Sequence, residues 1–156
     1  MIKITIVAIG KDKDKWVADG SEHFVKLLSR YATIEFKFLA NIKSSASLSP
    51  AEIKKQEAKE LIKHLDKAYN IALSDAGQKF DSIKFASRWQ KILQSSQSRI
   101  NFIIGGPYGL DDEILNMADF KLSLSPMTFS HQLVRLVLLE QIYRAFSIIN
   151  NTDYHK

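Results

Sequence analysis

The sequence predicts an α/β fold, with a mostly parallel sheet flanked by helices. Stretches rich in β-branched and aromatic residues alternate five times with stretches of helical spacing, and this alternation is typical of parallel strands joined by crossover helices. The 156 residues include 46% apolar residues and contain neither an internal repeat nor a linker. We therefore expect one domain over residues 1–156.

Five stretches are expected to form strands. The first is a β-branched run that stops at Gly10, and the second alternates apolar with charged side chains, which indicates a position near the edge of the sheet. The third is short and is expected to end in a loop that contains Asp75 and Gly77. The expected strands cover residues 2–9, 33–39, 69–73, 100–104 and 120–125.

Five further stretches are expected to be helical. The clearest start is at Ser49, because serine can cap a helix, Pro50 fits the first helical position and Glu52 can complete a capping box. Three acids at 111–113 suit the start of a short helix, where the macrodipole favours negative charge. The expected helices cover residues 16–30, 49–67, 82–94, a short segment from 111, and 130–149.

The last of these helices is apolar almost all round. Its leucine, valine, isoleucine and aromatic residues are interrupted by only six polar or charged side chains between residues 131 and 144. A helix docked on one face of a sheet needs a single apolar stripe, so a second surface must cover the remainder. The simplest candidate is another copy of the chain, which predicts a homodimer. The alternative is a helix buried wholly within one chain.

The charge favours an anionic partner. The chain has a net charge of +5, and five basic residues accompany one acid between residues 79 and 107. That segment is either a solvated helix face or a nucleic-acid contact. We expect a cytoplasmic protein with no membrane partner, because the chain has no cysteine, no apolar run of membrane-spanning length and no signal-peptide pattern. The four histidines show no metal-ligand spacing, so we expect no metal.

A glycine turn follows the fourth expected strand, in the sequence Ile-Gly-Gly-Pro-Tyr-Gly. Ligands of α/β proteins bind outside the carboxyl ends of strands, and glycine lets a ligand approach the main chain closely. The pattern matches neither a dinucleotide fingerprint nor a phosphate-binding loop, and acids follow it. We therefore expect either a plain tight turn or a site for a nucleoside-like ligand with little negative charge.

Two more stretches stand out. A strand runs into Ser125-Pro126, turns through residues 127–129 and enters the last helix at Ser130. The C-terminal residues Tyr154, His155 and Lys156 combine a stacking ring, a titratable ring and a cation, which suits an RNA base and its phosphate. Each stretch has a plainer alternative, namely an ordinary capped turn and a frayed terminus.

Together, "FIIGGPYGL", "LSLSPMTFSHQLVRLVLLEQIYRAFSI" and the terminal "DYHK" closely resemble the RlmH family. These are small SPOUT-class methyltransferases of bacterial large-subunit ribosomal RNA. The resemblance extends over essentially the whole chain, including the "IVAIGK" opening. It implies a C-terminal trefoil knot, a homodimer, and methylation of N3 of a pseudouridine on the assembled ribosome. Tyr108 and Ser130 depart from the pattern, since we expect a smaller or acidic residue and a proline there.

The resemblance also implies a cofactor, S-adenosyl-L-methionine, and residues that hold it. The positions that match the family's motifs are Leu73, Gly105, Gly106, Leu124, Ser125, Pro126, Met127, Thr128 and Phe129.

Methylation at N3 requires loss of the proton on that nitrogen, which a base or a positive field assists. We expect Tyr154, His155 and Arg144 to supply these groups, with His131 a weaker candidate, and we expect the tail to reach the partner's cofactor site. Arg135, Lys156 and Arg88 are the expected RNA contacts. Two alternatives are a non-enzymatic RNA-binding or ribosome-associated homodimer and a nucleotide-dependent oxidoreductase, which lacks a proper glycine fingerprint.

Overall fold

A computed structural model describes residues 1–43, 47–65, 67–95 and 98–156. Five strands and five helices alternate within these residues, in the predicted order. The strands are β1 (Ile2–Ile9), β2 (Ala32–Leu39), β3 (Tyr69–Lys79), β4 (Arg99–Ile104) and β5 (Phe120–Ser123). The helices are α1 (Lys15–Leu28), α2 (Pro50–Ile62), α3 (Ser82–Ser95), α4 (Asp112–Met117) and α5 (Leu133–Ile149).

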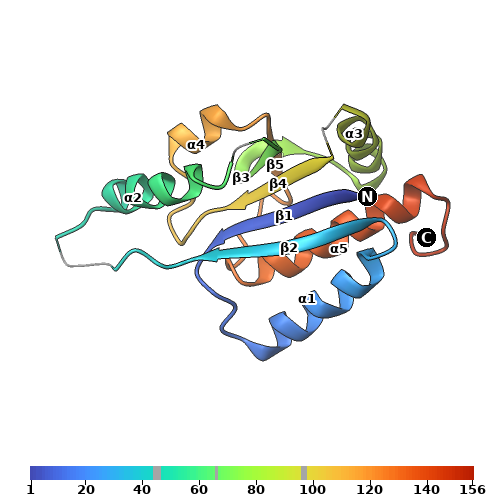
Figure 1. The fold of residues 1–156 in the computed structure, drawn as a ribbon, viewed down its shortest axis with the longest axis horizontal. Helices are drawn as coiled ribbons and strands as arrows, with labels where there is room; N and C mark the ends of the chain where they lie inside the picture. Colours follow the sequence, from blue (N-terminus) through green and yellow to red (C-terminus); the bar gives the residue numbers. More distant parts are fainter. Residues whose placement is uncertain (44–46, 66, 96–97) are drawn as a thin grey trace.

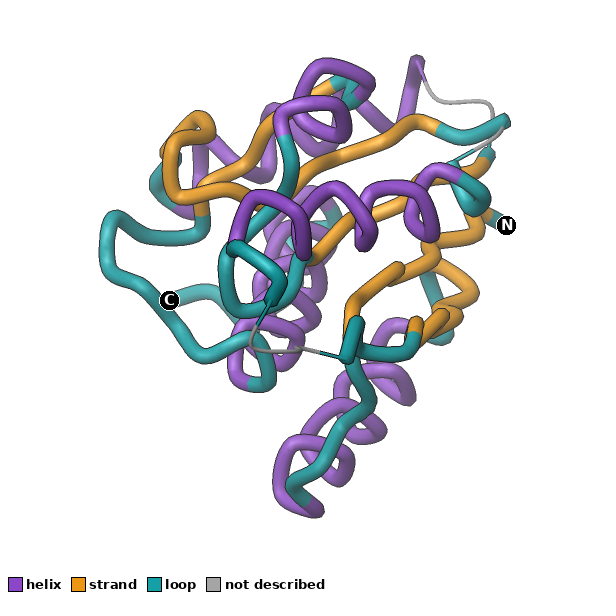
Figure 2. The backbone as a smooth tube through the Cα atoms, turned by 90° about the vertical axis from the view of Figure 1, so that its left-hand side faces the viewer, coloured by secondary structure: helices purple, strands orange, loops and turns teal. Residues whose placement is uncertain are grey.

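The strands form one parallel sheet in the order β2-β1-β4-β3-β5. This confirms the predicted fold class and the edge position of β2. Ile4 and Ile6 of β1 pack against α1, α3 and α5, whereas Val7 and Ile9 face α2 and α4. Helices therefore cover both faces of the sheet (Figures 1 and 2). The trefoil knot implied by the family resemblance stays a prediction.

Strand β3 is longer than predicted, because it continues through the expected loop to Lys79. It pairs with β5 twice: Leu73 and, after a shift in register, Gln78 both lie opposite Leu122. A Cβ atom at Gly77 would lie 2.7 Å from the carbonyl carbon of Leu122. Gly77 is thus needed for the close approach of two strands, not for a turn.

Helix α2 begins as predicted but ends earlier. The Ser49 hydroxyl accepts a hydrogen bond from the Glu52 amide, and the Glu52 carboxylate accepts one from the Ser49 amide, so the capping box is present. The expected end near residue 67 is wrong. The His64 amide bonds to the carbonyl three residues back, which tightens the last turn, and Lys67 has a φ of 57°.

Helix α5 packs between α1 and α3 and begins at Leu133 instead of Ser130. Ser130 precedes it as a cap, because its hydroxyl accepts a hydrogen bond from the Leu133 amide at 3.2 Å. A Cβ atom at Gly20 of α1 would lie 3.0 Å from the methyl groups of Leu136, so the two helices are in close contact. Several apolar side chains of α5 nonetheless stay only partly buried in a single chain: Leu133, Val134, Leu136, Val137, Tyr143, Ile148 and Ile149.

Candidate active site

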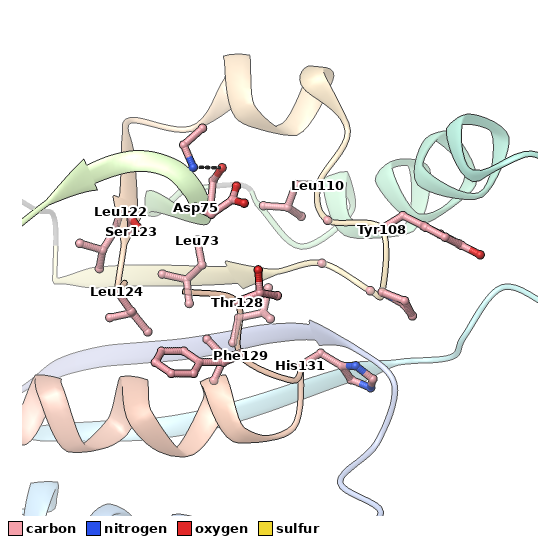
Figure 3. Close-up of a pocket in the computed structure, with 18 of the residues that line it drawn as sticks. Leu73, Asp75, Tyr108, Leu110, Leu122, Ser123, Leu124, Thr128, Phe129 and His131 are labelled. Atoms are coloured by element: carbon pink, nitrogen blue, oxygen red, sulfur yellow. Dashed lines mark hydrogen bonds between the residues drawn. The ribbon is translucent and has the colours of Figure 1, made fainter. Parts of the chain in front are cut away.

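A cavity of about 720 Å³ lies at the carboxyl ends of β4 and β5 and beside the middle of β3, at residues 73–76. Its walls come from segments far apart in the sequence, and Figure 3 shows Leu73, Leu124 and Thr128 pointing toward one another across it. The residues that line it are Lys54, 73–76, 104–110, Asp112, Leu115, 122–125, 127–131 and Val134. This volume is in the range of sites for small ligands and cofactors.

The glycine turn forms one wall of the cavity. The Gly109 amide donates a hydrogen bond to the Gly106 carbonyl at 3.0 Å, and Gly109 has a φ of 82°. A Cβ atom at Gly105 would lie 2.7 Å from the carbonyl carbon and oxygen of Gly109. The turn is therefore tight, and its glycines line the cavity with main chain. A nucleoside-like ligand at this turn stays a prediction.

The loop between β5 and α5 forms the opposite wall. Its conformation is fixed locally, since the Ser123 hydroxyl donates to the Ser125 carbonyl at 3.0 Å and the Ser125 hydroxyl accepts from the Met127 amide at 2.9 Å. All but one of the nine predicted cofactor residues line the cavity. The exception is Pro126, which lies in this loop without being among the lining residues.

The sequence alone did not single out the remaining walls. Ala76, Ile104, Leu110, Leu115 and Leu122 add apolar surface, and Lys54, Ser74, Asp75 and Asp112 add polar surface. Because ligands of parallel sheets bind at strand ends, the residues that follow the expected strand at 69–73 could have been predicted to line the cavity. The contribution of α2 and α4 carried no sequence signal.

Arg135 has a structural role at the start of α5. Its side chain is fully buried, and its guanidinium donates to the Ile9 and Gly10 carbonyls at 2.8 and 2.6 Å and pairs with Asp12 at 2.7 Å. These bonds fasten α5, and with it the cavity loop, to the end of β1. The burial of Arg135 contradicts the predicted RNA contact at this residue.

The other two predicted RNA contacts differ in exposure. Lys156 is exposed at the C-terminus, whereas Arg88 is half-buried and places its guanidinium 4.7 Å from the centre of the Phe120 ring. The Nε atom of Arg88 is buried and has no hydrogen-bond partner. Lys156 is therefore the more accessible of the two.

The three predicted catalytic residues lie together at the far end of α5. Glu140 pairs with Arg144 at 2.6 Å and accepts a hydrogen bond from the Tyr154 hydroxyl at 3.2 Å. The Arg144 guanidinium lies 3.1 Å from Nδ1 of His155 and 4.8 Å from the centre of the Tyr154 ring. We name Glu140, Arg144, Tyr154 and His155 the C-terminal cluster.

The C-terminal cluster is not near the cavity of its own chain. Val134, which lines the cavity, and Arg144 are ten positions apart on α5, or about 15 Å along the helix axis. Figure 1 places the C-terminus at the end of the molecule opposite the carboxyl ends of the strands. The structure thus brings the candidate catalytic groups together with one another but not with the candidate cofactor residues.

The titratable groups of the two regions differ. Burial and then the charge of Glu140 raise the pKa of the Tyr154 hydroxyl, so Tyr154 stays protonated at neutral pH. Because arginine only donates, Nδ1 of His155 is an acceptor, and a neutral ring carries its proton on Nε2. At the cavity, burial and then the charges of Arg135 and Lys13 lower the pKa of His131, which keeps that ring neutral.

The two departures from the family pattern have identifiable positions. Ser130 replaces the expected proline and caps α5 through its hydroxyl. Tyr108 is 52% exposed and lies at the rim of the cavity, pointing away from its centre (Figure 3). Among the described residues, no helix is long and apolar enough to cross a membrane, and no three metal-ligating side chains are grouped.

A family model described as a predicted SPOUT methyltransferase matches residues 2–155. This chain belongs to the SPOUT methyltransferase family. Among curated SPOUT relatives, the ribosomal RNA large subunit methyltransferase H proteins of Acetivibrio thermocellus and Parabacteroides distasonis are 43% and 36% identical. Each alignment covers 99% of this chain, and 100% and 99% of the relative. The resemblance inferred from the three motifs is confirmed, and the chain is an enzyme of the methyltransferase class.

Two solved structures show a similar fold at low sequence identity. A probable methylase family protein from Haemophilus influenzae matches with a TM-score of 0.55 and 13% identity, covering 98% of this chain and 70% of that one. The tRNA (m1G37) methyltransferase of Aquifex aeolicus matches with a TM-score of 0.55 and 16% identity, covering 92% and 69%.

Proposed function

We propose that the cavity binds S-adenosylmethionine and that this chain, as a cytoplasmic homodimer with one SPOUT domain per subunit, methylates large-subunit ribosomal RNA. The target we propose is N3 of a pseudouridine on the assembled ribosome. The observation that carries the proposal is the cavity itself, with bare main chain at Gly105 and Gly106 on one side and the loop after β5 on the other.

The chemistry of the lining suits this cofactor. Leucines from β3, β5 and the glycine turn provide apolar walls for an adenosyl group, and main-chain groups of the two loops are available for hydrogen bonds. Asp75 and Asp112 line the cavity, while Lys54 is the only lysine or arginine among the described residues that line it. This balance suits a sulfonium cation better than a polyphosphate.

When bound, S-adenosylmethionine supplies an activated methyl group and leaves as a neutral thioether. The protein must align N3 of the base with that methyl, exclude water and accept the N3 proton. Tyr154 cannot act as a base near neutral pH, because its pKa is raised. We propose that the Arg144 guanidinium leaves Nδ1 of His155 when the base binds, so that the freed Nδ1 lone pair takes the N3 proton. Arg144 then stabilises the negative charge on the base, and Tyr154 positions the ring.

These groups can reach a cofactor only if the C-terminal cluster of one subunit meets the cavity of its partner. The partly buried apolar side chains along α5 provide a surface for such a dimer. In this arrangement each active site is composite, with the cofactor held by one subunit and the proton transferred by the other. Lys156, at the exposed end of the tail, is then available to contact the RNA backbone.

The direct test incubates ribosomes that lack the modification with the protein and methyl-labelled S-adenosylmethionine, followed by mass spectrometry of the ribosomal RNA. We expect one methyl group at N3 of a large-subunit pseudouridine. Calorimetry with S-adenosylmethionine separates this from the non-enzymatic RNA-binding homodimer, which would show no cofactor binding. Label on another base, or on free RNA but not on ribosomes, would overturn the proposed target.

A further inference from the structure

A buried carboxylate of α2 lies against the glycine turn. Glu57 of α2 is only 3% exposed, although its neighbours on the buried face of this helix are apolar: Ile53, Ala58 and Leu61. Glu57 is not among the residues that line the cavity. A carboxyl group loses hydration when it is buried, so an acid at this position needs an explanation other than helix–sheet packing.

The carboxylate of Glu57 faces the main chain of Gly106. A Cβ atom built at Gly106 would lie 2.5 Å from Oε1 of Glu57 and 3.2 Å from Oε2. Burial raises the pKa of the Glu57 carboxyl, and a hydrogen bond from the Gly106 amide partly opposes that rise. A side chain at residue 106 would therefore displace the Glu57 carboxylate, whereas a side chain at residue 105 would meet the main chain of Gly109.

We propose that Glu57 is a positioning residue for the cofactor cavity: its buried carboxylate holds the Gly106 amide and so fixes the glycine turn that forms one wall of the cavity. This inference rests on the proposed function, because it assigns Glu57 to the binding of S-adenosylmethionine. Glu57 touches neither cofactor nor substrate in this role, and it acts through the turn. Its loss should weaken cofactor binding more than it slows methyl transfer at saturating cofactor.

A double-mutant cycle tests the proposed contact. Gly106→Ala puts a methyl group where Oε1 of Glu57 lies, and we expect it to raise the Kd for S-adenosylmethionine about 10-fold. In a Glu57→Ala background that overlap is relieved, so the same substitution should raise Kd by less than about 3-fold. Gly105→Ala is the matched control, because its overlap is with main chain and should cost the same in both backgrounds.

Single variants give the kinetic signature of a positioning residue. Glu57→Ala should raise Kd and KM for S-adenosylmethionine about 10-fold and change kcat at saturation by less than about 3-fold. Glu57→Gln keeps the acceptor oxygen, so it should restore both constants to within about 3-fold of the unmodified protein. If Glu57→Ala does not fold, Glu57→Asp takes its place in the cycle, because its shorter side chain withdraws the carboxylate from Gly106.

Equal costs of Gly106→Ala in both backgrounds would overturn the proposal, and so would an unchanged Kd in a folded Glu57→Ala variant. A failure of the proposed function is distinguishable from these results. If the unmodified protein does not bind S-adenosylmethionine, both the proposed function and the role of Glu57 are lost. If it binds but the cycle shows no coupling, only the role of Glu57 is lost.

Discussion

The cavity and the C-terminal cluster lie at opposite ends of α5 and are built in different ways. The cavity owes its shape to main chain: a tight glycine turn, a serine-rich loop, the ends of β4 and β5, and the middle of β3. The C-terminal cluster depends on side chains, which are joined by the ion pair and hydrogen bonds of Glu140 and Arg144. The cavity is therefore suited to binding a ligand, whereas the C-terminal cluster is suited to proton transfer.

The cavity and the C-terminal cluster of one chain are about 15 Å apart along α5, so they cannot act on the same substrate atom. One chain contains a complete candidate cofactor site and a complete set of candidate proton-transfer groups, yet it cannot bring them together in this conformation. A dimer in which the C-terminal cluster of one subunit meets the cavity of its partner would bring them together without rearranging either region. Cofactor binding and catalysis should then respond to different substitutions.

The largest effect should come from removing the tail. Deletion of residues 154–156 should lower the rate of methyl transfer at least about 100-fold, because it removes the proposed base. The affinity for S-adenosylmethionine should stay within about 2-fold, since the cavity lies elsewhere. Single-turnover assays on ribosomes and calorimetry measure the two quantities. A tail deletion that leaves turnover unchanged would remove the tail from the mechanism.

Gly105→Val should have the opposite effect to the tail deletion: it should weaken cofactor binding and leave the C-terminal cluster intact. Its Cβ atom would overlap the main chain of Gly109, which cannot move without opening the turn. We expect Kd for S-adenosylmethionine to rise about 100-fold, while the C-terminal cluster and the proposed homodimer persist. Calorimetry gives the first result, and sedimentation gives the second. Undiminished binding would show that the cofactor does not depend on this wall.

Mixing the two variants tests whether the site is composite. In a mixed dimer, the Gly105→Val subunit keeps its tail and the tail-deleted subunit keeps its cavity. These two intact parts form a working site only if the tail of one subunit acts at the cavity of the other. Random exchange at equal amounts should then restore about a quarter of the unmodified activity, because half of the dimers would each carry one working site. If the tail instead acts on its own subunit, no activity returns.

The sequence predicted the order of the elements because periodicity and turn residues are local signals. It also predicted the loops that line the cavity, because the glycine turn and the Pro126 loop are locally unusual. It failed where a residue's role depends on distant partners. Arg135 resembled an RNA contact but is buried by the end of β1.

Two further residues show the same limit. Gly77 resembled a turn glycine, but its requirement comes from Leu122, 45 positions later in the chain. Glu57 lies in a stretch of alternating charges that is typical of a solvated helix face, and only the tertiary contact with Gly106 shows that it is buried. Long-range contacts of this kind leave no pattern in a single sequence.

The smallest effect concerns the stability of the cavity wall and its dependence on pH. Burial raises the pKa of Glu57 above its ordinary value of 4.5, so the folded protein holds this proton more tightly than the unfolded chain does. The stability associated with the protonated group is fully present below pH 4.5 and is lost as pH rises through the raised pKa. Glu57→Gln removes this loss, because the amide stays neutral.

We therefore expect the Tm of Glu57→Gln, measured relative to that of the unmodified protein, to rise by a few °C at most between pH 4 and pH 7. Thermal unfolding without cofactor, followed by circular dichroism at both pH values, measures the change. Gln56→Ala on the same helix removes no ionisable group, so its effect on Tm should be the same at both pH values. An opposite trend for Glu57→Gln would mean that the carboxylate is stabilised by its surroundings, and the glycine turn would then gain stability from the charge of Glu57.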